Sequence, residues 1–332
     1  MVFGQTLRSE DPLMRQPVRL PRVDLYGVAT DAGASTRGTG MGPEALRIAG
    51  LVETLEALGH EVTDHGDLRS ERANRQADVL ALAAQTSSLA MESLASSAVP
   101  VFLGGDHSLS MGTVSGVSRH CAAVGKDVHV LWIDAHADFN TPGISPSGNL
   151  HGMPLALLCG EAEFGDAFGG PWRGEVDPQN VTIFGARSID RDERRLLAER
   201  GIEVVDMRMI DEMGAVALMR RVIERAEGAH LHVSLDVDAM DPSIAPGAGT
   251  LVPGGLTYRE AHLVMEMLHD SGLVGSLDIV ELNPFLDRAG ESARLLVALA
   301  ASLFGRQIIA RGLTLNNAPA HTEPAAPARL RA

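Results

Sequence analysis

The chain has 332 residues, of which 45% are hydrophobic and 4% aromatic, and its formal net charge is -15 at pH 7. An acidic protein disfavours a polyanionic partner, and so few aromatic residues provide no stacking platform for single-stranded nucleic acid. No apolar run is long enough for a transmembrane helix, and residues 1–20 lack the apolar core of a signal peptide. Two cysteines give no disulfide framework. We therefore expect a cytoplasmic protein that binds neither nucleic acid nor a membrane.

Short apolar runs alternate with longer helical patterns, a rhythm typical of βα units and a parallel sheet. The first half is predicted to hold a strand over 23–28, a Gly-rich loop over 30–42, helices over 43–58 and 76–97, strands over 99–103 and 128–133, and a polar loop without regular structure over 140–154. The second half is predicted to hold strands over 181–184 and 203–205, a helix over 215–225, a strand over 232–235, a helix over 258–268, a strand over 276–280 and a helix over 291–303.

No internal repeat and no linker composition divides the chain. The predicted fold class is therefore α/β, a single three-layer α/β/α domain over 23–312 with a mainly parallel central sheet. Residues 1–22 are predicted to be an N-terminal extension. Residues 313–332 are rich in Ala and Pro and are expected to be a disordered tail.

Charged groups and imidazoles follow four of the expected strands. They are His107 after the first, Asp134, His136 and Asp138 after the second, Asp236 and Asp238 after the third, and Glu281 after the fourth. Ligands of parallel sheets bind at the carboxyl ends of the strands, and alternate residues of a strand face the same side. The D-x-H-x-D and D-x-D spacings are therefore expected to bring their side chains together.

Four carboxylates and two imidazoles form a hard set of ligands, which suits Mn²⁺ better than Zn²⁺. Six ligands exceed what one ion normally takes from protein, so bridging carboxylates and two ions about 3.5–4 Å apart are predicted, with a water between them. The alternative is that these acids only cap turns.

Several segments together resemble the arginases, within the ureohydrolase family, and bacterial arginases most of all. They are GGDHS at 104–108, DAHADFNTP at 134–142, SPSGNLHGMP at 145–154, SLDVDAMDPSIAPGAGT at 234–250, GGLTYRE at 254–260 and ELNP at 281–284. The resemblance covers about 23–309. It implies an arginase-like fold and hydrolysis of L-arginine to L-ornithine and urea by a hydroxide that bridges two manganese ions per subunit. It also implies a homo-oligomer, a trimer or hexamer.

Carried over to this sequence, the resemblance implies two ligand sets that share the bridging carboxylates Asp134 and Asp236. One ion would be held by His107, Asp134, Asp138 and Asp236, and the other by Asp134, His136, Asp236 and Asp238. Asp138 is also expected to orient the hydroxide, and Glu281 to pair with the guanidinium. His151 is the predicted proton donor to the leaving amine.

The same resemblance assigns the amino-acid end of the substrate to loop residues. Asn140 and Ser147 are expected to bind the α-carboxylate, Asp190 the α-ammonium, and Glu193 to assist through water. Thr250 is expected to hold the substrate end or Glu281. Taken one at a time, such residues are more often turn formers, and His151 more often a solvated loop histidine.

Two other functions stay open from the sequence. One is a ureohydrolase acting on agmatine or a guanidino acid with the same metals. The second is a metal-binding protein of this fold that has lost catalysis and serves as a sensor or scaffold. His230 and His232 share the strand parity of Asp236 but lie deeper, so they are predicted to be hydrogen-bonded structural residues.

Overall fold

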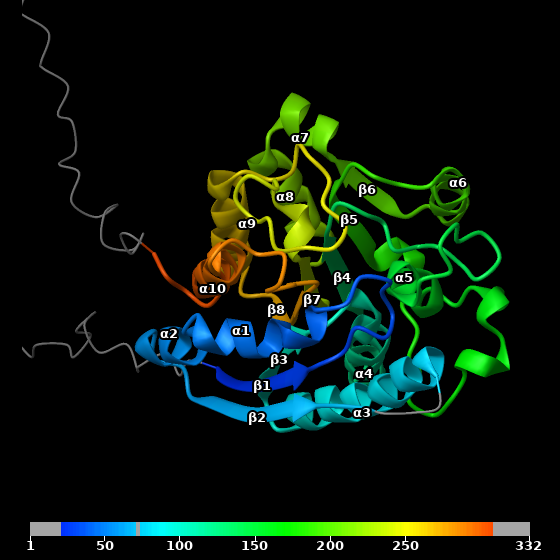
Figure 1. Cartoon of the computed structure of the whole chain (residues 1–332), viewed down its shortest axis with the longest axis horizontal. Coiled ribbons are helices and arrows are strands. Elements are labelled where there is room, and N and C mark those ends of the chain that lie inside the picture. Colours follow the sequence, from blue (N-terminus) through cyan, green and yellow to red (C-terminus); the bar gives the residue numbers. More distant parts are fainter. Residues whose placement is uncertain (1–20, 71–73, 308–332) are drawn as a thin grey trace, which may run out of the picture.

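One parallel sheet runs through the computed structural model, which describes residues 21–70 and 74–307 (Figure 1). Its eight strands in this described part are β1 (Arg22–Val28), β2 (Val62–Leu68), β3 (Ala98–Gly104), β4 (Val128–Ile133), β5 (Val181–Ala186), β6 (Glu203–Asp206), β7 (His230–Asp236) and β8 (Val274–Val280). Their order is β2-β1-β3-β8-β7-β4-β5-β6, and each pairing is parallel. The predicted α/β fold with a mainly parallel sheet is confirmed.

Helices cover both faces of the sheet and make the two outer layers (Figure 1). One hydrophobic core lies under α1 (Gly42–Ile48), α2 (Leu51–Ala57), α7 (Met207–Met213), α8 (Ala215–Arg225), α9 (Tyr258–Ser271) and α10 (Glu291–Leu303). The opposite core lies under α3 (Arg75–Ala95), α4 (Ser110–Ala123), α5 (Pro154–Leu158) and α6 (Arg191–Arg200).

The central strands are buried on both faces, as expected where helices cover a parallel sheet on each side. In β7, Leu231, Val233 and Leu235 face the core under α8 and α9. The residues between them, His232 and Ser234, are also buried but polar, and they hydrogen-bond to partners on the other side. One face of the central sheet therefore carries a polar stripe inside the protein.

The helix predicted over 43–58 is wrong as a single element. α1 ends at Ile48 and α2 begins at Leu51, because Gly50 adopts a left-handed conformation with φ of 87°. Such a φ suits glycine and interrupts a helix. The polar loop over 140–154 was also predicted to contain no element, yet a short 3-10 helix spans Leu150–Gly152.

Residues 1–20 of the predicted extension and the predicted tail at 313–332 lie outside the described residues. Arg22, which was assigned to that extension, is the first residue of β1. In the described part of the chain, no helix is both long and apolar enough to cross a membrane.

Candidate metal and substrate site

Tight turns, not strand alternation, bring the acidic residues together. Asp236 is the last residue of β7, but Asp134, His136, Asp138 and Asp238 all follow the end of their strand. At the ends of β3, β4 and β7 an Asp Oδ1 accepts the amide two residues later: Asp106 from Ser108 at 3.0 Å, Asp134 from His136 at 2.7 Å, and Asp236 from Asp238 at 2.8 Å. These Asx turns fold each segment back over the sheet. The expected convergence at the carboxyl ends of the strands is present, but these turns and not strand alternation produce it.

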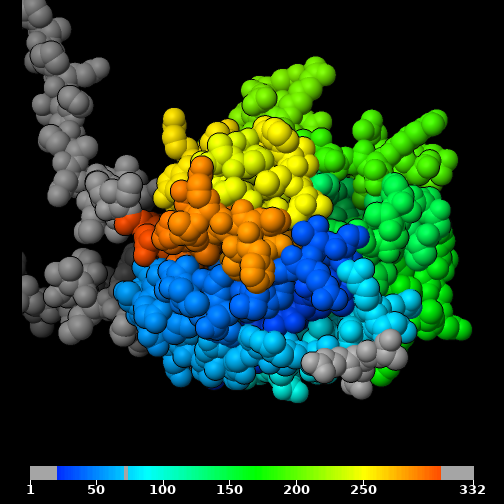
Figure 2. All heavy atoms as spheres, viewed as in Figure 1, coloured from blue at the N-terminus to red at the C-terminus, as the bar shows by residue number. Residues whose placement is uncertain are grey.

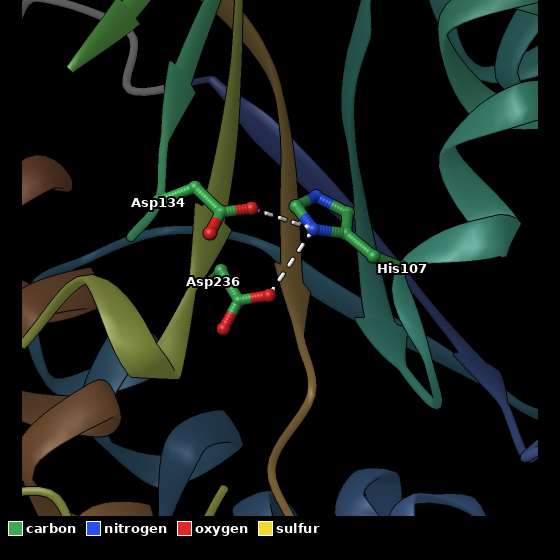
Figure 3. A group of neighbouring side chains, drawn as sticks. All are labelled: His107, Asp134 and Asp236. Carbon is green, nitrogen blue, oxygen red and sulfur yellow. Dashed lines mark ion pairs between the residues drawn. The ribbon is translucent and has the colours of Figure 1, made fainter. Parts of the chain in front are cut away.

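The first group of ligating atoms surrounds His107 (Figure 3). Its Nδ1 lies 3.2 Å from Asp134 Oδ2, 3.1 Å from Asp236 Oδ2 and 3.1 Å from Asp138 Oδ2. His107 is fully buried, and its Nδ1 has no hydrogen-bond partner among the described residues. A buried ring nitrogen facing three carboxylate oxygens has the arrangement of a metal ligand.

The second group surrounds His136. Its Nδ1 lies 3.1 Å from Asp238 Oδ2 and 3.4 Å from Asp134 Oδ1. Asp134, His136 and Asp238 can offer atoms to one ion, as can His107, Asp134 and Asp236. Asp134 belongs to both groups and can bridge them. Asp236 joins only the first group, and so its bridging role stays a prediction.

Trp132, at the end of β4, supports both groups. Its ring stacks on His107 with centroids 3.9 Å apart and planes 6° apart. Its Nε1–H donates to Asp134 Oδ2 at 3.0 Å. The indole thus fixes one imidazole and one carboxylate at the same time, a role that the sequence analysis missed.

Burial and crowding of like charges raise the pKa of several carboxyl groups. Burial, followed by the charges of Asp238 and Asp134, raises the pKa of Asp236 well above its usual range. Burial and the charge of Asp134 raise the pKa of Asp138 to about 6. A divalent cation would relieve this repulsion and displace protons, so the donor set fits such an ion.

Glu281 and His151 form a pair at the edge of these groups. His151 Nδ1 lies 2.8 Å from Glu281 Oε1, which also accepts the backbone N–H of His107 at 2.8 Å. Burial opposes protonation of His151, but the Glu281 carboxylate outweighs it and raises the pKa of the ring to about 9. Glu281 itself has φ of 63°, a strained backbone conformation for a non-glycine residue.

The predicted substrate residues gather around one cavity of about 130 Å³. Its lining includes Asn140, Ser147, Asp190, Glu193 and Thr250, together with the candidate ligands His136, Asp138 and Asp236. A second cavity of about 120 Å³ lies on the other side of His151 and Thr250, lined by Ala34, Thr39 and Glu281 among others. Figure 2 shows the dark-blue segment after β1 and the yellow segment after β7, both of which line it, lying against each other.

At the first cavity, Asn140 Nδ2 donates to Asp190 Oδ2 at 3.2 Å. The buried Asn140 Oδ1 has no hydrogen-bond partner among the described residues. Ser147 is exposed, and its Oγ accepts the amide of Asn149 at 3.2 Å, so its own proton can still be donated. The cavity lining therefore includes one available donor and one acceptor without a partner among the described residues.

Two of the predicted substrate residues make contacts that were not predicted. Thr250 Oγ1 donates to Asp238 Oδ2 at 2.9 Å, so it holds a candidate metal ligand and not Glu281. Glu193 is buried and accepts two backbone amides, Phe139 N at 2.8 Å and Asp190 N at 3.1 Å. Because both carboxylate oxygens are engaged, Glu193 fixes the loop that carries Asp190.

Arg187 is a further site residue that the sequence analysis missed. Its guanidinium donates to the carbonyl oxygens of Asp238 at 2.6 Å and Val252 at 2.7 Å, as well as to three others. It thereby ties the end of β5 to the turn that holds Asp238 and to the segment after Thr250. Its only sequence signal was a position shortly before Asp190 in the loop after β5.

The fold and these donor groups define a parallel α/β protein with a carboxylate–imidazole cluster at its strand ends. Residues 21–305 match the sequence model of the arginase family. The arginase of Agrobacterium fabrum is 49% identical over 312 residues, 90% of this chain and 96% of that protein. The chain belongs to the arginase family, as the resemblance predicted.

Solved structures agree with this membership. The arginase of Bacillus caldovelox in its native form at pH 5.6 aligns with a TM-score of 0.80 at 37% identity, covering 87% of this chain and 100% of that one. The Entamoeba histolytica arginase in complex with L-ornithine aligns with a TM-score of 0.79 at 26% identity, with the same coverage. Membership supports a hydrolase that acts on an amidine C–N bond.

Proposed function

We propose that this chain is an arginase that hydrolyses L-arginine to L-ornithine and urea with two manganese ions per subunit. The observation that carries the proposal is the cavity that joins Asp138, His136 and Asp236 to Asn140, Ser147 and Asp190. One end of this cavity suits metal-assisted hydrolysis, and the other suits the zwitterionic head of an amino acid. The relatives named above are arginases, which agrees with this substrate.

The metal end fits manganese by its donors. His107, Asp134, Asp138 and Asp236 are proposed to hold one ion, and Asp134, His136, Asp236 and Asp238 the other. Oxygen-rich sets with imidazole nitrogens suit Mn²⁺, and neither candidate ligand group contains a cysteine. When bound, the two ions would supply Lewis-acid chemistry, lowering the pKa of a water between them so that hydroxide is present near neutral pH.

His151 is proposed to carry the proton that the leaving amine needs. With its pKa raised to about 9, the ring is protonated near neutral pH. It borders both cavities, so a proton on it can reach a substrate that enters from either side. An amine leaves only after protonation, and a positioned imidazolium meets this requirement.

Glu281 is proposed to orient the guanidinium. Among the described residues, the hydrogen bonds to its carboxylate fall on Oε1, from His151 and from the His107 amide. We assign Oε2 to a guanidinium N–H, a charge-assisted contact that would hold the carbon over the metals. Asp138, whose pKa is raised to about 6, is assigned the role of aiming the nucleophile.

Substrate selection is proposed to rest on the Asn140–Asp190 pair. The amide donor and the carboxylate acceptor are complementary to an α-carboxylate beside an α-ammonium. Agmatine lacks the α-carboxylate, so it would leave Asn140 and Ser147 without their partner. The Asn140–Asp190 pair therefore favours arginine over agmatine.

The test is steady-state kinetics of the Mn²⁺-loaded protein on L-arginine, agmatine and guanidino acids, with urea as the product measured. We expect L-arginine to give the highest kcat/KM. An equal or higher value for agmatine would contradict the arginase proposal, and no urea from any substrate would favour a non-catalytic metal protein. Cytoplasmic location and a trimeric or hexameric homo-oligomer stay predictions from the resemblance, and light scattering tests the second.

A further inference from the structure

A chain of buried polar groups leads away from His107, on the side opposite the carboxylates. His107 Nε2 lies 2.8 Å from Ser234 Oγ on β7, which lies 3.4 Å from Ser110 Oγ on α4. Ser110 Oγ in turn donates to Asp278 Oδ2 on β8 at 2.7 Å. Each of these residues is fully buried. None of the roles assigned above to the site uses Ser110, Ser234 or Asp278.

The direction of these hydrogen bonds is fixed by proton counting. A serine hydroxyl has one proton to donate, and a carboxylate only accepts. Ser110 gives its proton to Asp278, so in its contact with Ser234 it accepts. Ser234 therefore donates its hydroxyl proton to Ser110. Its oxygen must then accept a hydrogen bond from His107 Nε2. The ring proton of neutral His107 thus lies on Nε2.

This assignment leaves the lone pair of His107 on Nδ1, the nitrogen that faces Asp134, Asp138 and Asp236. We propose that Asp278 is a positioning residue that, through Ser110 and Ser234, sets the tautomer of His107 and so prepares Nδ1 to bind metal. The inference rests on the proposed metal site. In the usual carboxylate–histidine–metal arrangement the carboxylate accepts directly from the histidine ring. Here the hydroxyl groups of Ser234 and Ser110 lie between the ring and the carboxylate.

The surroundings of Asp278 agree with such a role. Its carboxylate is fully buried, and its Oδ1 has no hydrogen-bond partner among the described residues. Burying a carboxylate is costly, so a buried Asp on a central strand calls for a reason. Its other polar neighbours are Thr113 Oγ1, which donates at 2.6 Å, and His232 Nε2 at 3.3 Å.

Thr113 supplies a matched control, because it shares the helix, the burial and the acceptor of Ser110 but lies outside the chain of hydrogen bonds to His107. Both residues lie on α4, both are fully buried, and both donate to the same Asp278 oxygen. Only Ser110 also contacts Ser234. If Asp278 only fastens β8 to α4, losing either hydroxyl should have the same effect.

The experiment compares Ser110→Ala, Ser234→Ala and Thr113→Val in the full chain. The measurements are Mn²⁺ affinity, from the electron paramagnetic resonance signal of free Mn²⁺, and the unfolding temperature of the metal-free protein. We expect Ser110→Ala and Ser234→Ala to bind Mn²⁺ about 10–100-fold more weakly. Thr113→Val should stay close to the wild type in affinity, although both α4 variants lose the buried hydrogen bond to Asp278 and some stability, and Ser110→Ala also loses its contact with Ser234.

Two outcomes would overturn the inference: unchanged affinity in both serine variants, or an equal loss of affinity in Thr113→Val and Ser110→Ala. Ser234→Ala keeps the test decisive if Ser110→Ala does not fold, because it breaks the first contact of the chain from a different element. A wild-type protein that takes up no Mn²⁺ would instead contradict the proposed function. The two failures are therefore distinguishable.

Discussion

The two ends of the site are built in different ways. The metal end lies at the carboxyl ends of central strands, where His107, Asp134 and Asp236 are at most 2% exposed. The substrate end lies in loops, where Ser147, Asp190 and Thr250 are exposed. At the metal end, a ring nitrogen without a hydrogen-bond partner faces carboxylates that repel one another. At the substrate end, Asn140 Nδ2 donates to Asp190 Oδ2, while Asn140 Oδ1 has no hydrogen-bond partner among the described residues.

This difference teaches what each end needs from a ligand. At the metal end, the buried carboxylates repel one another until a cation binds. Substitutions there should therefore change metal occupancy and the stability of the fold. The substrate-end residues belong to neither ligand group, so changes to them should act mainly on KM. The predictions below test this division, starting with the largest expected effect.

Asp236→Asn should abolish most Mn²⁺ binding and nearly all urea production, because it removes a buried carboxylate that faces His107 Nδ1. Loss of a residue that only hydrogen-bonds to a metal ligand typically weakens metal affinity about 10–100-fold. Loss of a metal-ligating side chain itself should therefore weaken it more. Elemental analysis and the urea assay check this. Asp106→Asn is the matched control, since Asp106 makes the same Asx turn and is fully buried but belongs to neither ligand group. Equal metal loss in both variants would mean that the turns, not the ligands, matter.

His151→Asn should retain its metals yet lower kcat by about 10²–10⁴-fold, the usual contribution of a general acid. The residue stands at the boundary of the two ends, so its loss should separate occupancy from turnover. Elemental analysis beside kcat decides the matter. A variant that turns over at the wild-type rate at every pH tested would remove His151 from the mechanism.

Asp190→Ala should lower kcat/KM for L-arginine about tenfold or more, mostly through KM, with the metals retained. One hydrogen bond to a charged group contributes about 1.5–3 kcal/mol, and a contact that is uniform across the reaction changes KM alone. Asp192→Ala is the control, because Asp192 lies in the first turn of the same helix but, in the described part of the chain, pairs with Arg195 at the surface. A metal loss in Asp190→Ala would show that the two ends are not independent.

Removal of metal should lower the unfolding temperature by about 5 °C or more relative to protein in excess Mn²⁺. A ligand at a hundred times its Kd stabilises the folded state by about 2.7 kcal/mol, and each kcal/mol shifts the midpoint by a few degrees. Calorimetry with and without chelator measures the shift. L-Arginine analogues added without metal should change the midpoint far less. If the analogues shifted the midpoint more than the metal does, the substrate end and not the metal end would be the part of the site that a ligand stabilises most.

Much of the metal end could be predicted because its residues lie in contiguous segments that end predicted strands. The helices and strands that support it were harder to predict. β2 was missed because Thr63, Asp64 and His65 are polar and exposed at the edge of the sheet, so no apolar run marks it. Its register with β1 depends on tertiary pairing.

α4 was missed for another reason, since its sequence is rich in Gly, Ser and Thr, which are poor helix formers. The structure explains two of these residues. A Cβ at Gly112 or Gly116 would lie 2.3 Å from the backbone oxygen of Ala83 or Ser87 on α3, so the close approach of the two helices requires glycine. Nothing local in the sequence reveals that contact.

The substrate end could be placed only by resemblance, because its residues come from separate loops and look like turn formers. The contacts of Thr250 with Asp238 and of Glu193 with two backbone amides were not predicted, since each depends on a loop that packs from elsewhere in the chain. Ser110 and Asp278 gave no signal at all. Ser110 on α4 and Asp278 on β8 come into contact only in the folded structure, where α4 packs against β7 and β8.

The stacking of Trp132 on His107 also gives the protein an optical signal of its own. The chain has two tryptophans, and the second, Trp172, lies near α3, where its carbonyl accepts a hydrogen bond from Ser87. Paramagnetic Mn²⁺ quenches the emission of a nearby indole, so the fluorescence of a Trp172→Phe variant should fall as the metal is titrated in. Loading could then be followed in real time, without a dye and without turnover.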